Sequence, residues 1–99
     1  MTAASHGELM ARRIALVEAL TALNARQLLH SQTRAGLEVE LLSCAEAVES
    51  EGETADARTR RAALEARLER VVALSGDCDR EQEALAGELS ELDRQLAEI

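Results

Sequence analysis

The feature that most constrains this chain is a heptad spacing on both sides of a short turn, Ser50-Glu51-Gly52-Glu53-Thr54. Residues spaced alternately by four and three positions share one face of an α-helix, and apolar residues at this spacing form the contact stripe of a coiled coil. We call the stripe before the turn the first seam. It consists of Leu9, Arg13, Leu16, Leu20, Leu23, Gln27, His30, Arg34, Leu37, Leu41, Cys44 and Val48.

A second seam keeps the same spacing after the turn and crosses Gly76 without a change of phase. Because a turn usually resets the phase, we expect one helix through Gly76, although a glycine inside a helix costs about 1 kcal/mol relative to alanine. The alternative is a three-helix bundle broken at Gly76 or, on a weaker signal, a break at Gly36. The second seam consists of Ala57, Arg61, Leu64, Leu68, Val71, Ser75, Cys78, Gln82, Leu85, Leu89, Leu92, Leu96 and Ile99.

The turn residues carry the signals that end one helix and begin another. Gly52 suits the left-handed conformation that follows a helix C-terminus, and Thr54 suits the N-cap of the next helix. Ser5 and Glu8 have the spacing of a capping box at the start of the first helix. In an alternative reading, Ser50 is the cap, with Glu53, and Gly52 lies inside the helix.

Folding the chain between Gly52 and Glu53 brings the two seams face to face. We therefore predict an all-α fold, a long antiparallel two-helix hairpin of the coiled-coil type, forming one domain over residues 1–99. The expected helices span about residues 6–50 and 55–98, with the turn at 51–54. The predicted facing pairs include Leu9–Leu96, Leu23–Gln82, Gln27–Cys78, His30–Ser75, Arg34–Val71, Leu37–Leu68 and Cys44–Arg61.

The composition is typical of long helices, and it limits the binding partners and the cellular location that we expect. The chain has no aromatic residue and no proline, and its net charge is −8. The negative charge argues against binding to a nucleic-acid backbone, which requires clustered positive charge. No stretch approaches the roughly 18 apolar residues of a membrane span, and Met1–Gly7 lacks the apolar stretch of a signal peptide. We expect a cytoplasmic protein without membrane insertion, and the use of arginine without lysine suggests a bacterial source.

The polar residues of the seams are expected to set the register of the hairpin and not to carry chemistry. His30 has only Ser75 and Cys78 as close partners for a metal, which is a poor ligand set. Cys44, facing Arg61, is the better thiolate candidate, but Cys44 and Cys78 are too far offset to form a disulfide. We predict no catalytic residue, no cofactor and no metal. The register-setting residues are Gln27, His30, Arg34, Ser75, Cys78 and Gln82.

The first helix has a second apolar stripe beside its seam, which a two-helix hairpin leaves uncovered. A wide apolar stripe usually indicates burial against something else. We expect a second copy to cover it, giving a homodimeric four-helix bundle, or a partner protein. The stripe consists of Met10, Ile14, Val17, Leu28, Ala35 and Leu42.

These features predict a non-enzymatic protein–protein interaction module. In architecture alone, without a diagnostic motif, the chain is similar to small acidic helical hairpins that act as adaptors or export chaperones in bacterial flagellar and type III secretion. A self-associating coiled-coil scaffold is the alternative. Secreted type VII hairpins are similar in length, but they carry Trp-x-Gly at the turn and a tyrosine in the tail, where this chain has Glu51-Gly52 and no aromatic residue.

Overall fold

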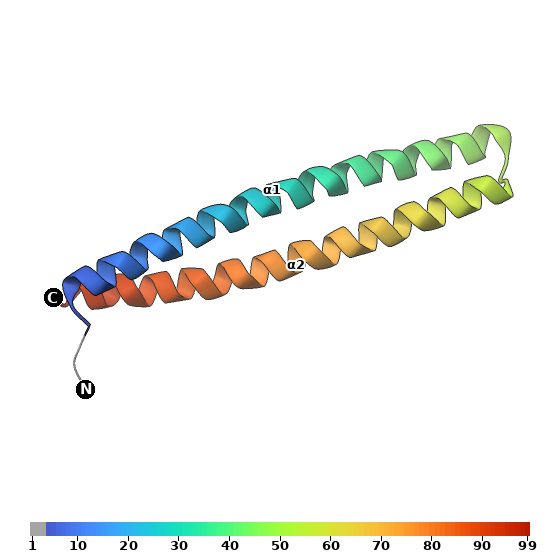
Figure 1. The fold of residues 1–99 in the computed structure, drawn as a ribbon. Coiled ribbons are helices and arrows are strands. Elements are labelled where there is room, and N and C mark those ends of the chain that lie inside the picture. Colours follow the sequence, from blue (N-terminus) through green and yellow to red (C-terminus); the bar gives the residue numbers. More distant parts are fainter. Residues whose placement is uncertain (1–3) are drawn as a thin grey trace. The chain divides into compact units, whose positions relative to one another are not determined.

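A computed structural model describes residues 4–99 of the chain, and two helices account for nearly all of them. Helix α1 spans His6–Glu51 and helix α2 spans Ala55–Ala97 (Figure 1). The all-α two-helix hairpin is therefore confirmed, with helix bounds within one residue of those expected. Both helices continue through their internal glycines, Gly36 and Gly76, so the three-helix alternative is wrong.

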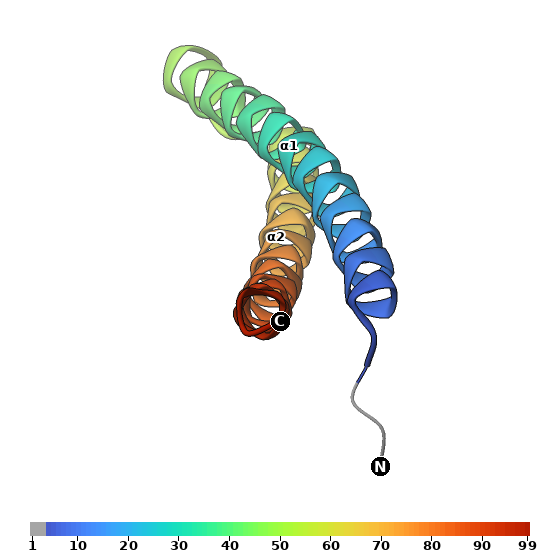
Figure 2. The same ribbon diagram turned by 90° about the vertical axis from the view of Figure 1, so that its left-hand side faces the viewer.

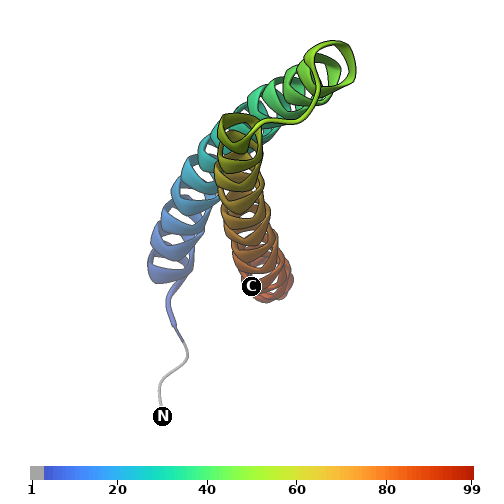
Figure 3. The same cartoon turned by 90° about the vertical axis from the view of Figure 1, so that its right-hand side faces the viewer.

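The turn between the two helices is visible in Figure 3, and its hydrogen bonds are those expected from its residues. Gly52 has a φ of 84°, in the left-handed region, and its N–H donates to the carbonyl oxygen of Val48 at 2.8 Å. A single bond of this kind is the αL form of helix termination. The Thr54 hydroxyl then accepts a hydrogen bond from the N–H of Ala57 at 3.0 Å, as an N-cap does. Ser50 instead donates to carbonyls of its own helix, so the alternative cap is wrong.

The start of α1, on the side of the molecule that Figure 2 faces, has the predicted capping box. The Ser5 hydroxyl accepts a hydrogen bond from the Glu8 N–H at 3.1 Å, and the Ser5 N–H donates to the Glu8 carboxylate at 3.3 Å. The reciprocal bonds satisfy two backbone donors that a helix start otherwise leaves unpaired.

The helices divide into two compact units, which we describe separately. The terminal unit combines the chain up to Gln27 with Cys78–Ile99, and the turn unit is Leu28–Asp77. In the terminal unit, the buried apolar residues are Leu9, Leu23, Cys78 and Leu92. In the turn unit, Leu37, Cys44, Leu64 and Val71 form one buried cluster, against which Leu41 and Leu68 pack.

The seams identify the buried side of each helix almost completely. Every residue of the first seam is buried or half-buried except Arg34, and every residue of the second seam is buried or half-buried except Ile99. Arg34 departs from the expectation because its long side chain turns outward to Glu38, four residues along the same helix, at 2.8 Å. The guanidinium stays hydrated in this conformation, whereas an apolar side chain at position 34 would pack within the seam.

Candidate interaction surfaces

Three polar bridges join α1 to α2 in the terminal unit. Their distances are 2.8 Å for Arg13 Nε to Asp93 Oδ1, 2.6 Å for Gln82 Nε2 to Asn24 Oδ1, and 2.6 Å for Gln27 Nε2 to Asp79 Oδ1. The partners Asn24 and Asp79 lie one residue from the partners expected for Gln82 and Gln27. The bridges fix an antiparallel register close to the predicted one. Arg13 bonds to Asp93, whereas Gln27, which comes later in α1, bonds to Asp79, which comes earlier in α2.

The other residues predicted to set the register have different surroundings. His30 and Ser75 are half-buried in the turn unit, and Cys78 is buried in the terminal unit. Arg34 is exposed, because its side chain turns away from the seam toward Glu38. Gln27 and Gln82 each make a hydrogen bond from one helix to the other. The signal that sequence reasoning missed is the polar residue next to the seam, since Asn24, Asp79 and Asp93 each follow a seam position directly.

The two cysteines are free thiols, and both are buried. Cys44 belongs to the apolar cluster of the turn unit. Arg61, the residue expected to face it, forms an ion pair with Glu53 in the turn at 2.6 Å. Buried cysteines in apolar surroundings behave as small apolar side chains.

Within residues 4–99, no group of three or more histidine, cysteine, aspartate or glutamate side chains is arranged to hold a metal ion. Over the same residues, neither helix has a segment long and apolar enough to cross a membrane.

The most prominent surface in the turn unit is an uncharged stripe on the outer side of α1. We call it the α1 face, and it consists of Leu28, Gln32, Ala35, Val39 and Leu42. At about 100° per residue, these five side chains fall within about 80° of the helix circumference, opposite the seam. Leu28 is 59% exposed, Val39 67% and Leu42 61%. Sequence reasoning identified Leu28, Ala35 and Leu42 but missed Val39, and also the neighbouring Leu29, which is 61% exposed.

The remaining residues of the predicted apolar stripe lie in the terminal unit. Met10, Ile14 and Val17 are all exposed there, and Ile14 is 57% exposed. The six predicted interface residues are thus exposed throughout, and they are shared equally between the two units. Whether any of them contacts a partner stays a prediction.

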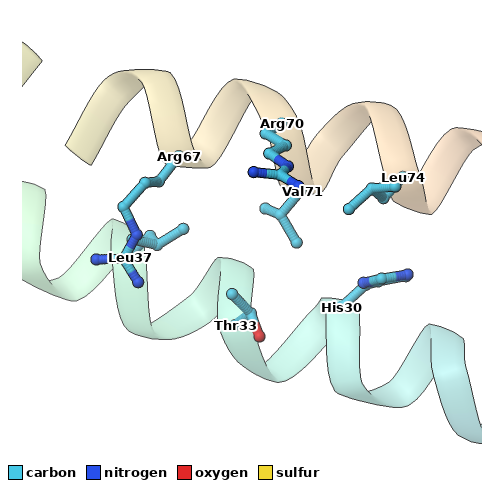
Figure 4. Close-up of a pocket in the computed structure, with 7 residues that line it drawn as sticks. All are labelled: His30, Thr33, Leu37, Arg67, Arg70, Val71 and Leu74. Carbon is cyan, nitrogen blue, oxygen red and sulfur yellow. The ribbon is translucent and has the colours of Figure 1, made fainter. Parts of the chain in front are cut away.

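A groove lies between α1 and α2 in the turn unit, on a different side of α1 from the α1 face (Figure 4). Its volume is about 300 Å³. Its residues come from both helices, and the arginines were not singled out from the sequence because they lie beside the seam and not on it. The groove is lined by His30, Thr33, Leu37, Arg67, Arg70, Val71 and Leu74.

The strongest electrostatic perturbation is at the surface of the terminal unit. The guanidinium of Arg94 forms an ion pair with Glu91 and another with Glu98, the latter at 2.6 Å. Hydrogen bonds to its carboxylate, first from Arg94 and then from Gln95, lower the pKa of Glu91 to about 2. The same pairing raises the pKa of Arg94 above its ordinary value. These are contacts within one helix, typical of a solvated helix surface.

The chain matches no protein-family model, no curated protein and no solved structure.

Proposed function

We propose that this protein is a non-enzymatic interaction module that binds an amphipathic helix of a partner protein on the α1 face. The observation that supports this most directly is the exposure of Leu28, Val39 and Leu42 on one side of a helix whose other side is already packed. Contiguous exposed aliphatic side chains are a usual mark of protein-binding surfaces. Helix-in-groove and helix-on-helix recognition use apolar anchors at this same spacing.

The proposed role is that of a small acidic adaptor or export chaperone in the bacterial cytoplasm. A chaperone of this kind shields the apolar side of a client helix until the client reaches its assembly site. The net charge of −8 supports the proposal, because it keeps a molecule with an exposed apolar face soluble between binding events.

Self-association as a coiled-coil scaffold is the second candidate, and Gly36 favours it. Gly36 lies next to Ala35 in the middle of α1, and a Cβ added there would meet nothing within 4 Å. The packing of the hairpin itself therefore does not require a glycine, which costs about 1 kcal/mol inside a helix. Small residues between aliphatic ones let a second helix approach closely, as two copies of α1 would in a homodimer.

The test compares matched charged variants as affinity baits in extracts of the source cells. Leu28→Glu with Leu42→Glu alters the α1 face, and Ile14→Glu with Val17→Glu alters the exposed stripe of the terminal unit. Ala45→Glu with Ala47→Glu is the control, because both alanines are exposed residues of α1 outside these stripes. Circular dichroism checks that every variant stays helical.

We expect the Leu28/Leu42 variant to lose a partner that the wild type and the control retain, as measured by quantitative mass spectrometry. Light scattering tests the second candidate. A homodimeric scaffold should have twice the mass of one chain, and the variant with Leu28→Glu and Leu42→Glu should have the mass of a single chain. Retention of every partner and of the molar mass in both stripe variants would contradict the proposal.

A further inference from the structure

The groove of the turn unit has an apolar floor and a basic rim. Leu37 and Val71 are 3% and 5% exposed and form the floor together with Leu74. Figure 4 shows Val71 and Leu74 pointing from α2 toward α1, while the side chain of Arg67 extends across to the neighbourhood of Leu37. The groove thus offers an apolar contact and positive charge within a space of about 300 Å³.

The two arginines of this rim have no acidic partner among residues 4–99. Arg13, Arg61 and Arg94 each form an ion pair with a carboxylate. Arg67 and Arg70 have no hydrogen bond or ion pair to any residue of 4–99, and no carboxylate among these residues lines the groove. Arg12, Arg26, Arg58 and Arg60 likewise have no such partner among the described residues, so the rim is distinguished by its place beside the apolar floor of the groove. Because Arg67 and Arg70 are three residues apart on α2, they lie on the same side of the helix, and both guanidinium groups can line the rim of the groove.

Three kinds of ligand differ in how well they fit this combination. A nucleic-acid backbone is disfavoured by the net charge of −8. A small inorganic anion would pair with the arginines but leave Leu74, which is 41% exposed, uncovered. An amphipathic helix satisfies both parts, because an aliphatic side chain and acidic side chains one turn away project from the same face.

We propose that this groove binds an acidic amphipathic helix of another protein, whose carboxylates pair with Arg67 and Arg70 while an aliphatic side chain covers Leu74. Arginine is suited to this role because its planar guanidinium can bind a carboxylate through two parallel hydrogen bonds. The site is separate from the α1 face, since Leu37 and Leu28 are nine residues apart and lie on opposite sides of α1. Its test is therefore independent of the function proposed above.

The experiment is an NMR titration of the ¹⁵N-labelled full-length protein with synthetic capped peptides of about 15 residues, long enough for appreciable helicity. One peptide carries leucine and glutamate at helical spacing, and a matched peptide carries lysine in place of every glutamate. The comparison variants are Arg67→Glu with Arg70→Glu, and the control Arg58→Glu with Arg60→Glu. The control changes the charge by the same amount on α2 at exposed positions outside the groove.

We expect saturable shifts of the amides of Thr33, Leu37, Val71 and Leu74 with the glutamate peptide only. The affinity should fall about tenfold or more in the Arg67/Arg70 variant, stay near the wild-type value in the Arg58/Arg60 control, and weaken as salt is raised. If the Arg67/Arg70 variant loses helicity, Arg67→Gln with Arg70→Gln removes the charge without adding a carboxylate.

Three results would overturn the proposal. Absence of saturation with the glutamate peptide would show that no helix of this chemistry binds. Equal binding of the lysine peptide, or equal loss in the Arg58/Arg60 control, would show that the rim does not select charge. The third result would come from a titration with inorganic phosphate. If phosphate shifted the same amides as much as the peptide does at equal concentration, the groove would be an anion site without helix recognition.

Discussion

The terminal unit and the turn unit use the same heptad spacing, yet they join their two helices by different means. In the turn unit, Leu37, Cys44, Leu64 and Val71 form one continuous buried cluster. In the terminal unit, the pairs Arg13–Asp93, Asn24–Gln82 and Gln27–Asp79 reach from one helix to the other. Apolar contact is not directional, whereas a hydrogen bond requires its partner at one position.

Among residues 4–99, both units bury four apolar residues, so burial stabilises both. The bridges add a second contribution in the terminal unit, because they specify which residues face each other. The turn unit also carries the α1 face and the groove rimmed by Arg67 and Arg70. Each unit contains arginines that pair with carboxylates, Arg13 and Arg94 in the terminal unit and Arg34 and Arg61 in the turn unit.

The largest expected effect is on the core of the turn unit. Leu64→Ala should lower the free energy of unfolding by about 2–5 kcal/mol, because it leaves a cavity in the buried cluster. Leu89→Ala in the terminal unit should cost less, since Leu89 is only half-buried. Urea unfolding followed by circular dichroism measures both, with the exposed Leu42→Ala as control, expected within about 0.5 kcal/mol of the wild type. A loss at Leu89 equal to that at Leu64 would remove the distinction between the units.

A smaller effect is expected at the bridge between Asn24 and Gln82. A double-mutant cycle of Asn24→Ala and Gln82→Ala should give a coupling free energy of about 0.5–1.5 kcal/mol, toward the lower end because water reaches the bond. The matched cycle pairs Asn24→Ala with Glu83→Ala, the neighbouring residue, and should give no coupling. Equal coupling in the two cycles would mean that this bridge does not specify the register.

The smallest effect concerns Glu91 at the surface of the terminal unit. An NMR pH titration of its side-chain carboxyl carbon should give a pKa of about 2, well below the ordinary 4.5. Because the folded-state pKa is lowered, the contribution to stability is present above the unfolded value and is lost as the pH falls from about 4.5 toward 2. Arg94→Gln should return the pKa toward its ordinary value, and Arg80→Gln should not. An unchanged titration in Arg94→Gln would show that another group lowers the pKa.

The sequence was most informative about features that depend on neighbours along the chain. Spacing identified the buried side of both helices, Ser5 and Thr54 identified their caps, and Gly52 identified the turn, because each depends on periodicity or on a local hydrogen bond. The seam correctly kept its phase across Gly76, where a glycine alone suggested a break.

The candidate surfaces were only partly predictable, for physical reasons. Arg34 occupies a seam position, but a long charged side chain can leave the interface while its backbone stays in phase. Val39 was missed because the predicted stripe took residues that directly follow a seam position, and Val39 is two residues after Leu37. The groove around Arg67 and Arg70 depends on which side chains of two distant segments line one space, and periodicity along one helix does not contain that information.

The central claim is that the α1 face of the turn unit is a protein-binding surface. Its most direct test places a photo-crosslinking amino acid at Leu42, and at Ala47 as the control, in the protein produced by its own cells. We predict a discrete crosslinked product from Leu42, lost when Leu28→Glu is added, and a much weaker one from Ala47. A product of twice the chain mass would assign the face to self-association, and another mass would identify a partner protein. No product from Leu42 above the level of Ala47 would contradict the claim.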